Sequence, residues 1–140
     1  MSSNSFNKEI SITSKTENLS QVREFVKTSA ELCGFNKEEI GKIILAVDEA
    51  TTNVIKHAYK YAVDKQIKIK SEFKNGKFSI IIIDQGDHFD PERVPLPDLK
   101  EYHKQKRVGG LGMFLMRKLM DDVKYEYLAN QNKVTLVKYI

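Results

Sequence analysis

The chain has 140 residues, of which 41% are hydrophobic and 30% are charged, and its formal net charge is +4 at pH 7. These values are typical of one soluble globular domain and argue against extended disorder. Lysine and arginine are scattered rather than gathered in a basic arm, so we expect no direct binding to nucleic acid. No apolar run approaches the roughly 20 residues of a membrane span, and the N-terminal stretch lacks the apolar core of a signal peptide. We therefore expect no membrane association and a cytoplasmic location.

The first part of the chain is predicted to form a strand followed by two helices. Isoleucines that alternate with polar residues predict a strand at 8–14, and apolar residues at helical spacing predict a helix at 20–33. Asn36 and Glu39 form a capping box at the start of a longer helix. That helix continues through the stretch 45–59, LAVDEATTNVIKHAY.

A hairpin and a long connection are predicted next. Alternating residues predict a strand at 66–73, and an apolar run predicts a strand at 77–84 that is buried on both faces. Asn75-Gly76 between them is the strongest short hairpin signal. The connection from 85 to 108 contains all three prolines and is too long for a simple loop, so we interpret it as a lid or binding segment.

The end of the chain is predicted to form a helix and a second hairpin. The stretch 109–120, GGLGMFLMRKLM, has the pattern of a glycine turn that opens a helix. Two closing strands, 122–128 and 133–140, are expected to pair around residues 130–132. Consecutive antiparallel strands with helices on the other side predict an α+β fold, a two-layer α/β sandwich in a single domain over residues 1–140.

Three polar residues recur at four-residue intervals in the long helix. Because Glu49, Asn53 and His57 are four apart, they lie along one side of that helix. A carboxylate one turn from a carboxamide suits a hard cation such as Mg²⁺, or a water that Glu49 would deprotonate while Asn53 holds the metal. The alternative is a solvated polar face, and the spacing alone favours that second interpretation.

Two further motifs suit nucleotide binding. Asp84 ends a buried strand, where its carboxylate can accept a hydrogen bond from an amine such as that of adenine, and Gly86 lets the chain turn. Gly109, Gly110 and Gly112 offer free N–H groups and a favourable helix dipole to phosphate oxygens. Each motif alone is weak, because an aspartate in a turn is common and the glycine turn lacks the lysine of a Walker motif.

The order of these motifs resembles the GHKL superfamily of ATPases, which includes gyrases and histidine kinases. The stretch 45–59 is similar to its N box, 84–86 to its first glycine box and 109–112 to its second. Over nearly the whole chain the sequence is similar to the small stand-alone anti-sigma factor serine kinases. This resemblance implies the Bergerat ATP-binding fold, with a mixed, mostly antiparallel sheet, helices on one face and an ATP lid at about 87–108.

The resemblance also implies residue roles, with ATP and Mg²⁺ as cofactors. Glu49 would be the general base, Asn53 would bind the nucleotide through Mg²⁺, and Asp84 would accept a hydrogen bond from adenine. The other residues implied to bind ATP are Gly86, Gly109, Gly110, Leu111, Gly112 and Thr135. His57 would be a packing or capping residue at the helix end.

We therefore expect an ATP-dependent protein serine/threonine kinase that acts as an anti-sigma factor. It would bind a sigma factor, phosphorylate an anti-anti-sigma antagonist protein and form a homodimer. The alternative is a non-catalytic, nucleotide-sensing module that regulates a partner, but the presence of both Glu49 and Asn53 favours the enzyme. Lys104, Lys106 and Arg107 either supply positive charge for phosphoryl transfer or form a solvated run.

Overall fold

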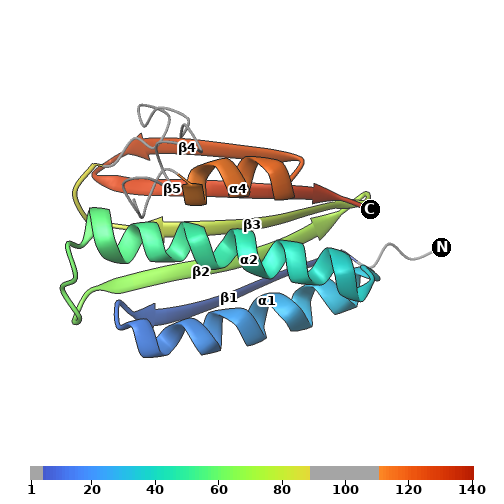
Figure 1. Cartoon of the computed structure of the whole chain (residues 1–140), viewed down its shortest axis with the longest axis horizontal. Coiled ribbons are helices and arrows are strands. Elements are labelled where there is room, and N and C mark those ends of the chain that lie inside the picture. The colour runs from blue at the N-terminus through green and yellow to red at the C-terminus, as the bar shows by residue number, and fades with distance from the viewer. Residues whose placement is uncertain (1–4, 89–110) are drawn as a thin grey trace, which may run out of the picture.

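A five-stranded sheet carries helices on one face in the computed structural model, which describes residues 5–88 and 111–140 (Figure 1). The helices lie side by side, with α2 between α1 and α4. In chain order the elements are β1 Phe6–Thr13, the 3-10 turn η1 Thr16–Asn18, α1 Leu19–Cys33, α2 Lys37–Asn53, the π-helical turn η2 Val54–Ala58, β2 Gln66–Lys74, β3 Lys77–Asp84, α4 Leu111–Leu119, β4 Asp122–Leu128 and β5 Gln131–Tyr139. This arrangement confirms the predicted α+β sandwich.

The sheet has the strand order β1-β2-β3-β5-β4. Each of its four pairs of neighbouring strands is antiparallel. The expectation of a mixed sheet is therefore wrong for the described strands. The physical reason is the position of β5: β3 and β4 run in the same direction, but β5 inserts between them and pairs antiparallel with each.

Local signals in the sequence explain where several elements begin and end. The Asn36 side chain accepts a hydrogen bond from the Glu39 amide at 2.8 Å, and the predicted capping box starts α2. Asn75 and Gly76 have φ angles of 52° and 76°, as the two central residues of a primed hairpin turn require. The predicted bounds of the strand 77–84 are those of β3.

The turn of the second hairpin lies earlier than predicted. Ala129 and Asn130 have positive φ angles of 56° and 62°, and Leu128 pairs directly with Gln131. A turn of two residues is therefore complete before Gln131. As a consequence Asn132, which was expected in the turn, lies within β5, and its side chain lies on the same face of the sheet as that of Asp84.

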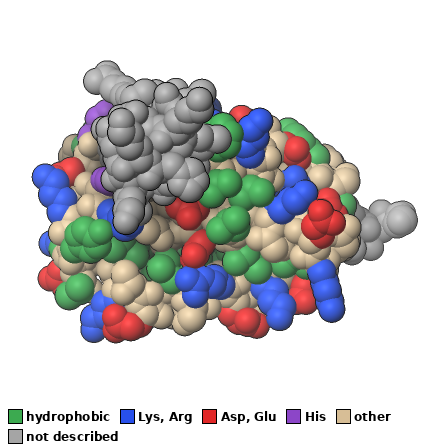
Figure 2. Space-filling view, in the orientation of Figure 1, with side chains coloured by type: hydrophobic (Ala, Val, Ile, Leu, Met, Phe, Trp, Pro, Cys, Tyr) green, Lys and Arg blue, Asp and Glu red, His purple; other side chains and the backbone are tan. Residues whose placement is uncertain are grey.

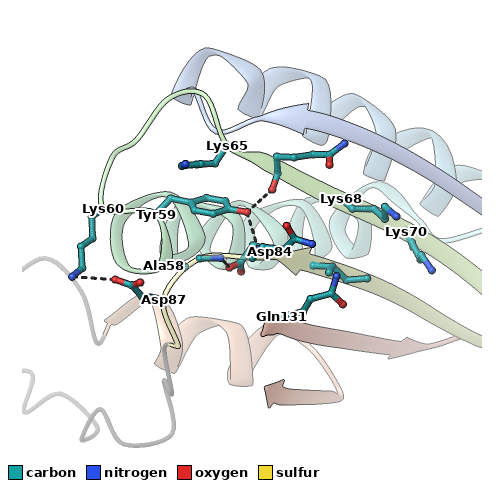
Figure 3. Close-up of a pocket in the computed structure, with 13 residues that line it drawn as sticks. Ala58, Tyr59, Lys60, Lys65, Lys68, Lys70, Asp84, Asp87 and Gln131 are labelled. Carbon is teal, nitrogen blue, oxygen red and sulfur yellow. Dashed lines mark hydrogen bonds and ion pairs between the residues drawn. The ribbon is translucent and has the colours of Figure 1, made fainter. Parts of the chain in front are cut away.

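Strand alternation decides which side chains face the helices. In β3, Phe78, Ile80 and Ile82 are fully buried against the helices, and Asp84 follows at the same two-residue period. Lys68 and Lys70 of β2 point to the opposite face (Figure 3). Asp84 therefore lies on the helix side, at the end of the strand, where it can meet the end of α2.

On the side shown in Figure 2, the described residues form no large area of a single charge. Among the described residues on this side, basic and acidic side chains alternate with hydrophobic ones. No helix within residues 5–88 and 111–140 is long and apolar enough to span a membrane. Residues 89–108 of the predicted lid lie outside the described residues.

Candidate functional site

The end of α2 carries an unsatisfied polar group. Asn53 is the last residue of α2 and is followed by η2, in which the Tyr59 amide donates to the Val54 carbonyl at 2.9 Å, five residues earlier. The Nδ2 atom of Asn53 is buried and has no hydrogen-bond partner among the described residues. A buried donor without a partner is costly, and π turns are frequent at functional sites. Asn53 Nδ2 is therefore suited to donate a hydrogen bond to an acceptor on a ligand.

Asp84 is a buried carboxylate with one oxygen already engaged. The residue is 2% exposed, and Oδ1 accepts hydrogen bonds from the Gly86 amide at 2.8 Å and from Asn132 Nδ2 at 2.9 Å. Burial raises the pKa of Asp84 above its ordinary value, while the hydrogen bonds from Asn132 and Gly86 act in the opposite direction. Within the described part of the chain, no donor reaches Oδ2.

Asn53 and Asp84 meet in one cavity between the helices and the sheet, which we call the Asp84 pocket. Its volume is about 20 Å³, room for about one water molecule. Most of its surface is apolar, so its polar groups are the natural points of recognition. Its lining residues are Ala50, Asn53, Val54, Ala58, Asp84, Tyr125, Asn132 and Val134. A ligand larger than water requires the surrounding elements to move apart.

The loop after β3 docks directly on η2. A Cβ atom on Gly86 would lie 2.5 Å from the carbonyl oxygen of Ala58, so only glycine permits this approach. The Asp87 amide donates to the same carbonyl at 2.8 Å. The Tyr59 hydroxyl accepts from the Gln85 amide at 2.8 Å, as the dashed lines in Figure 3 show. These contacts hold Asp84 against the helix that carries Asn53.

Glu49 lies one helical turn before Asn53 and is half-buried. No hydrogen bond or ion pair engages it within residues 5–88 and 111–140, so its carboxylate is available to a substrate. The neighbouring acid differs, because Asp48 accepts from the Arg23 guanidinium at 3.0 and 3.2 Å. Two consecutive acidic residues therefore have different roles, and only Glu49 stands in line with Asn53.

A cation at this site would have few protein ligands. No cluster of three or more His, Cys, Asp or Glu side chains able to hold a metal occurs among the described residues. Mg²⁺ is commonly held by one or two protein oxygens together with substrate phosphates and waters. A single carboxamide oxygen from Asn53 beside a phosphate-bearing ligand fits that mode of binding.

The other predicted ligand-binding residues do not line the Asp84 pocket or lie outside the described residues. Thr135 pairs with Ile81, so it lies on the face of the sheet away from the helices and is not brought near Asp84. Leu111 and Gly112 are the first residues of α4. Gly109 and Gly110, like Lys104, Lys106 and Arg107, lie outside the described residues.

Asn132 was not predicted as a site residue, and the structure places it opposite Asp84 in the ladder of β3 and β5. Tyr59 and Tyr125, which also shape the site, were not predicted either. The signal that identifies Asn132 is parity: it is three residues from Thr135, so the two side chains face opposite sides of the sheet. Using that signal requires the hairpin register, which depends on the turn at Ala129 and Asn130.

Replacing Asp84 by Asn is expected to stabilise the folded protein at neutral pH by about 1 kcal/mol. The asparagine keeps the Oδ1 acceptor and removes a buried charge. Burial raises the pKa of Asp84, so the folded protein binds the proton of this carboxyl group more tightly than the unfolded chain does. The stability gained from this protonation is complete below the ordinary pKa of 3.8 and is lost as pH rises through the folded-state pKa. Urea unfolding at several pH values should show a higher free energy of unfolding for the variant than for the wild type. This difference should shrink toward acid pH. An advantage that grows toward acid pH would contradict this assignment.

Comparison with known protein families identifies a histidine kinase-like ATPase domain, whose family model matches residues 12–138. Serine-protein kinase RsbW of Listeria monocytogenes is 35% identical over 135 residues, covering 94% of this chain and 85% of that protein. RsbW of Bacillus subtilis is 31% identical over 139 residues, covering 94% and 84%. The chain therefore belongs to the histidine kinase-like ATPase family, in the branch of the RsbW serine-protein kinases.

A solved structure supports the fold independently. The crystal structure of the RsbU and RsbW domains of Rv1364c from Mycobacterium tuberculosis matches with a TM-score of 0.68. The match covers 96% of this chain and 32% of that chain at 18% sequence identity. The two proteins therefore share the fold of the sheet and its helices.

Proposed function

We propose that the chain is an ATP- and Mg²⁺-dependent serine kinase that acts as an anti-sigma factor. It binds a sigma factor and phosphorylates an anti-anti-sigma antagonist protein, and it functions as a homodimer in the cytoplasm. One observation carries the nucleotide part of this proposal: Asn53 and Asp84 line one pocket, with Glu49 one helical turn away. Membership of the RsbW branch supports the reaction and the class of partner.

The Asp84 pocket accounts for binding of the base. Once the elements around the pocket have moved apart, the free oxygen of Asp84 accepts a hydrogen bond from the amino group of adenine, and the apolar lining packs against the ring. Gly86 keeps this carboxylate in place through its contact with Ala58. The phosphates then extend toward the start of α4, where Leu111 and Gly112 offer amide groups.

The end of α2 accounts for phosphoryl transfer. Asn53 would hold Mg²⁺ through its carboxamide oxygen, and the ion would supply positive charge that neutralises the phosphates. Glu49 accepts the proton of the attacking serine hydroxyl, because it is half-buried and has no other described partner. The oxygen of serine attacks the terminal phosphorus, the bond to the bridging oxygen breaks, and ADP leaves. The domain spans residues 1–140, with the lid at about 87–108 covering the nucleotide.

Incubation with labelled ATP tests the reaction. The full chain is mixed with Mg²⁺, [γ-³²P]ATP and purified candidate antagonist proteins, and the modified residue is located by mass spectrometry. We expect phosphoserine on one antagonist, and we expect the chain to hold a purified sigma factor in the absence of the unmodified antagonist. ATP binding without any transfer would contradict the kinase and favour a nucleotide-sensing module instead.

Replacing Asn53 by Ala is expected to remove the benefit of Mg²⁺ for ATP binding, because the variant lacks the proposed oxygen ligand. Calorimetric titration with ATP, with and without Mg²⁺, measures the change. His57→Gln is the matched control, since His57 is exposed one turn further along and is expected to be structural. If Asn53→Ala still gained affinity from Mg²⁺ to the same extent as the control, the ligand assignment would fail.

A further inference from the structure

We infer that Asn132 is a positioning residue that sets the selectivity of the pocket for a 6-amino purine. It holds one oxygen of the Asp84 carboxylate, so that the other oxygen faces the exocyclic amino group of the base. This inference rests on the proposed nucleotide site and deepens it. It assigns base selectivity to a pair of residues, one on β3 and one on β5.

The contacts of Asn132 determine its orientation. The residue is 9% exposed, and Nδ2 donates to Asp84 Oδ1 at 2.9 Å and to the Asp87 carbonyl at 2.8 Å, with a longer contact of 3.5 Å to the Gly86 carbonyl. All three partners are acceptors, so the nitrogen and not the oxygen of the carboxamide must face them. Its two hydrogens are therefore directed to Asp84 and Asp87.

This orientation divides the carboxylate of Asp84 into two functions. Oδ1 receives two donors, Gly86 N and Asn132 Nδ2, whereas Oδ2 receives none from the described residues. An oxygen that can only accept pairs well with an amino group, and it repels the 6-oxo group of hypoxanthine or guanine. A site built to bond such a group discriminates strongly against an analogue that lacks it.

Asn132 also prevents the carboxylate from turning. Asp84 and Asn132 are direct partners across the ladder of β3 and β5, and both line the Asp84 pocket. Without Asn132, Asp84 Oδ1 would keep only the Gly86 amide, and the Asp87 carbonyl would lose its donor. The carboxylate could then rotate, and the acceptor would no longer be aimed at one position of the base.

The test compares ATP with inosine triphosphate, which differs by an oxygen in place of the 6-amino group. Calorimetry gives Kd for both nucleotides with the wild type, Asn132→Leu, Asn132→Ser and the control Lys133→Leu, whose exposed side chain lies on the other face. We expect the wild type and control to prefer ATP by roughly 100-fold or more. Asn132→Leu should lower this ratio by about 10-fold, and Asn132→Ser, which retains one donor, should give an intermediate ratio.

The possible outcomes separate the role of Asn132 from the existence of the nucleotide site. Weaker binding of both nucleotides by the same factor would show that Asn132 only supports the fold, and it would overturn the inference while the nucleotide site stands. Failure of the wild type to bind either nucleotide would refute the proposed function and this inference with it. If Asn132→Leu does not fold, as judged by circular dichroism, Asn132→Ser decides: an unchanged ATP preference overturns the inference.

Discussion

Glu49→Gln is expected to slow phosphoryl transfer to the protein substrate by about 10²–10⁴-fold, while ATP binding is retained. The substitution keeps the size of the side chain and removes its capacity to accept a proton. Glu49 lies one turn from Asn53 and outside the Asp84 pocket. The substitution should therefore leave the adenine pocket and the proposed metal ligand unchanged. Single-turnover transfer from labelled ATP measures the rate, and calorimetry measures the affinity.

Asp48→Asn is the matched control for this experiment. Asp48 is the adjacent acid, but it is held by Arg23 at 3.0 Å on a partly exposed surface. Loss of such a pair costs about 0–1 kcal/mol of stability and should leave the transfer rate unchanged. If the two variants lost transfer to the same degree, or if Glu49→Gln transferred at the normal rate, Glu49 would not be the base.

Gly86→Ala is expected to destabilise the protein by about 1–3 kcal/mol and to weaken ATP binding strongly. The added Cβ would lie 2.5 Å from the Ala58 carbonyl oxygen and 2.6 Å from its carbon, and these are backbone atoms that cannot move aside alone. The loop must therefore separate from η2, which displaces Asp84 from its place beside Asn53. Urea unfolding and an ATP titration measure the two effects.

Gly41→Ala provides a control with the opposite sign. Gly41 lies within α2, and nothing is within 4 Å of the Cβ that alanine would add. Alanine in an exposed helical position is expected to stabilise the protein by about 1 kcal/mol and to leave ATP binding unchanged. Equal stability of Gly86→Ala and the wild type would contradict the close packing of the loop on Ala58.

Features that depend on short-range signals were predictable from the sequence. The capping box at Asn36 and Glu39 and the turn at Asn75-Gly76 are each encoded by a few adjacent residues, and the structure has them where the sequence predicts them. Burial on both faces of β3 follows from its run of isoleucines. The resemblance of three separated motifs to one family then predicted the fold as a whole.

Features that depend on pairing between distant segments were not predictable in the same way. The insertion of β5 between β3 and β4, which makes the described sheet antiparallel throughout, is not visible in any local pattern. A shift of one residue in the register of a strand reverses the faces of its side chains. The position of Asn132, and not the predicted Thr135, beside Asp84 follows from this register. The π turn at the end of α2 accompanies the docking of Gly86 on Ala58.

An ATP titration of the wild type and Asp84→Asn, each with and without Mg²⁺, tests whether Asp84 and Asn53 form the nucleotide site. We expect the wild type to bind one ATP per chain, more tightly with Mg²⁺, because Asp84 holds the adenine and Asn53 assists the metal. Asp84→Asn should remain folded and lose most of this affinity. Absence of ATP binding by the wild type, or an unchanged affinity in Asp84→Asn, would show that these residues do not form the nucleotide site.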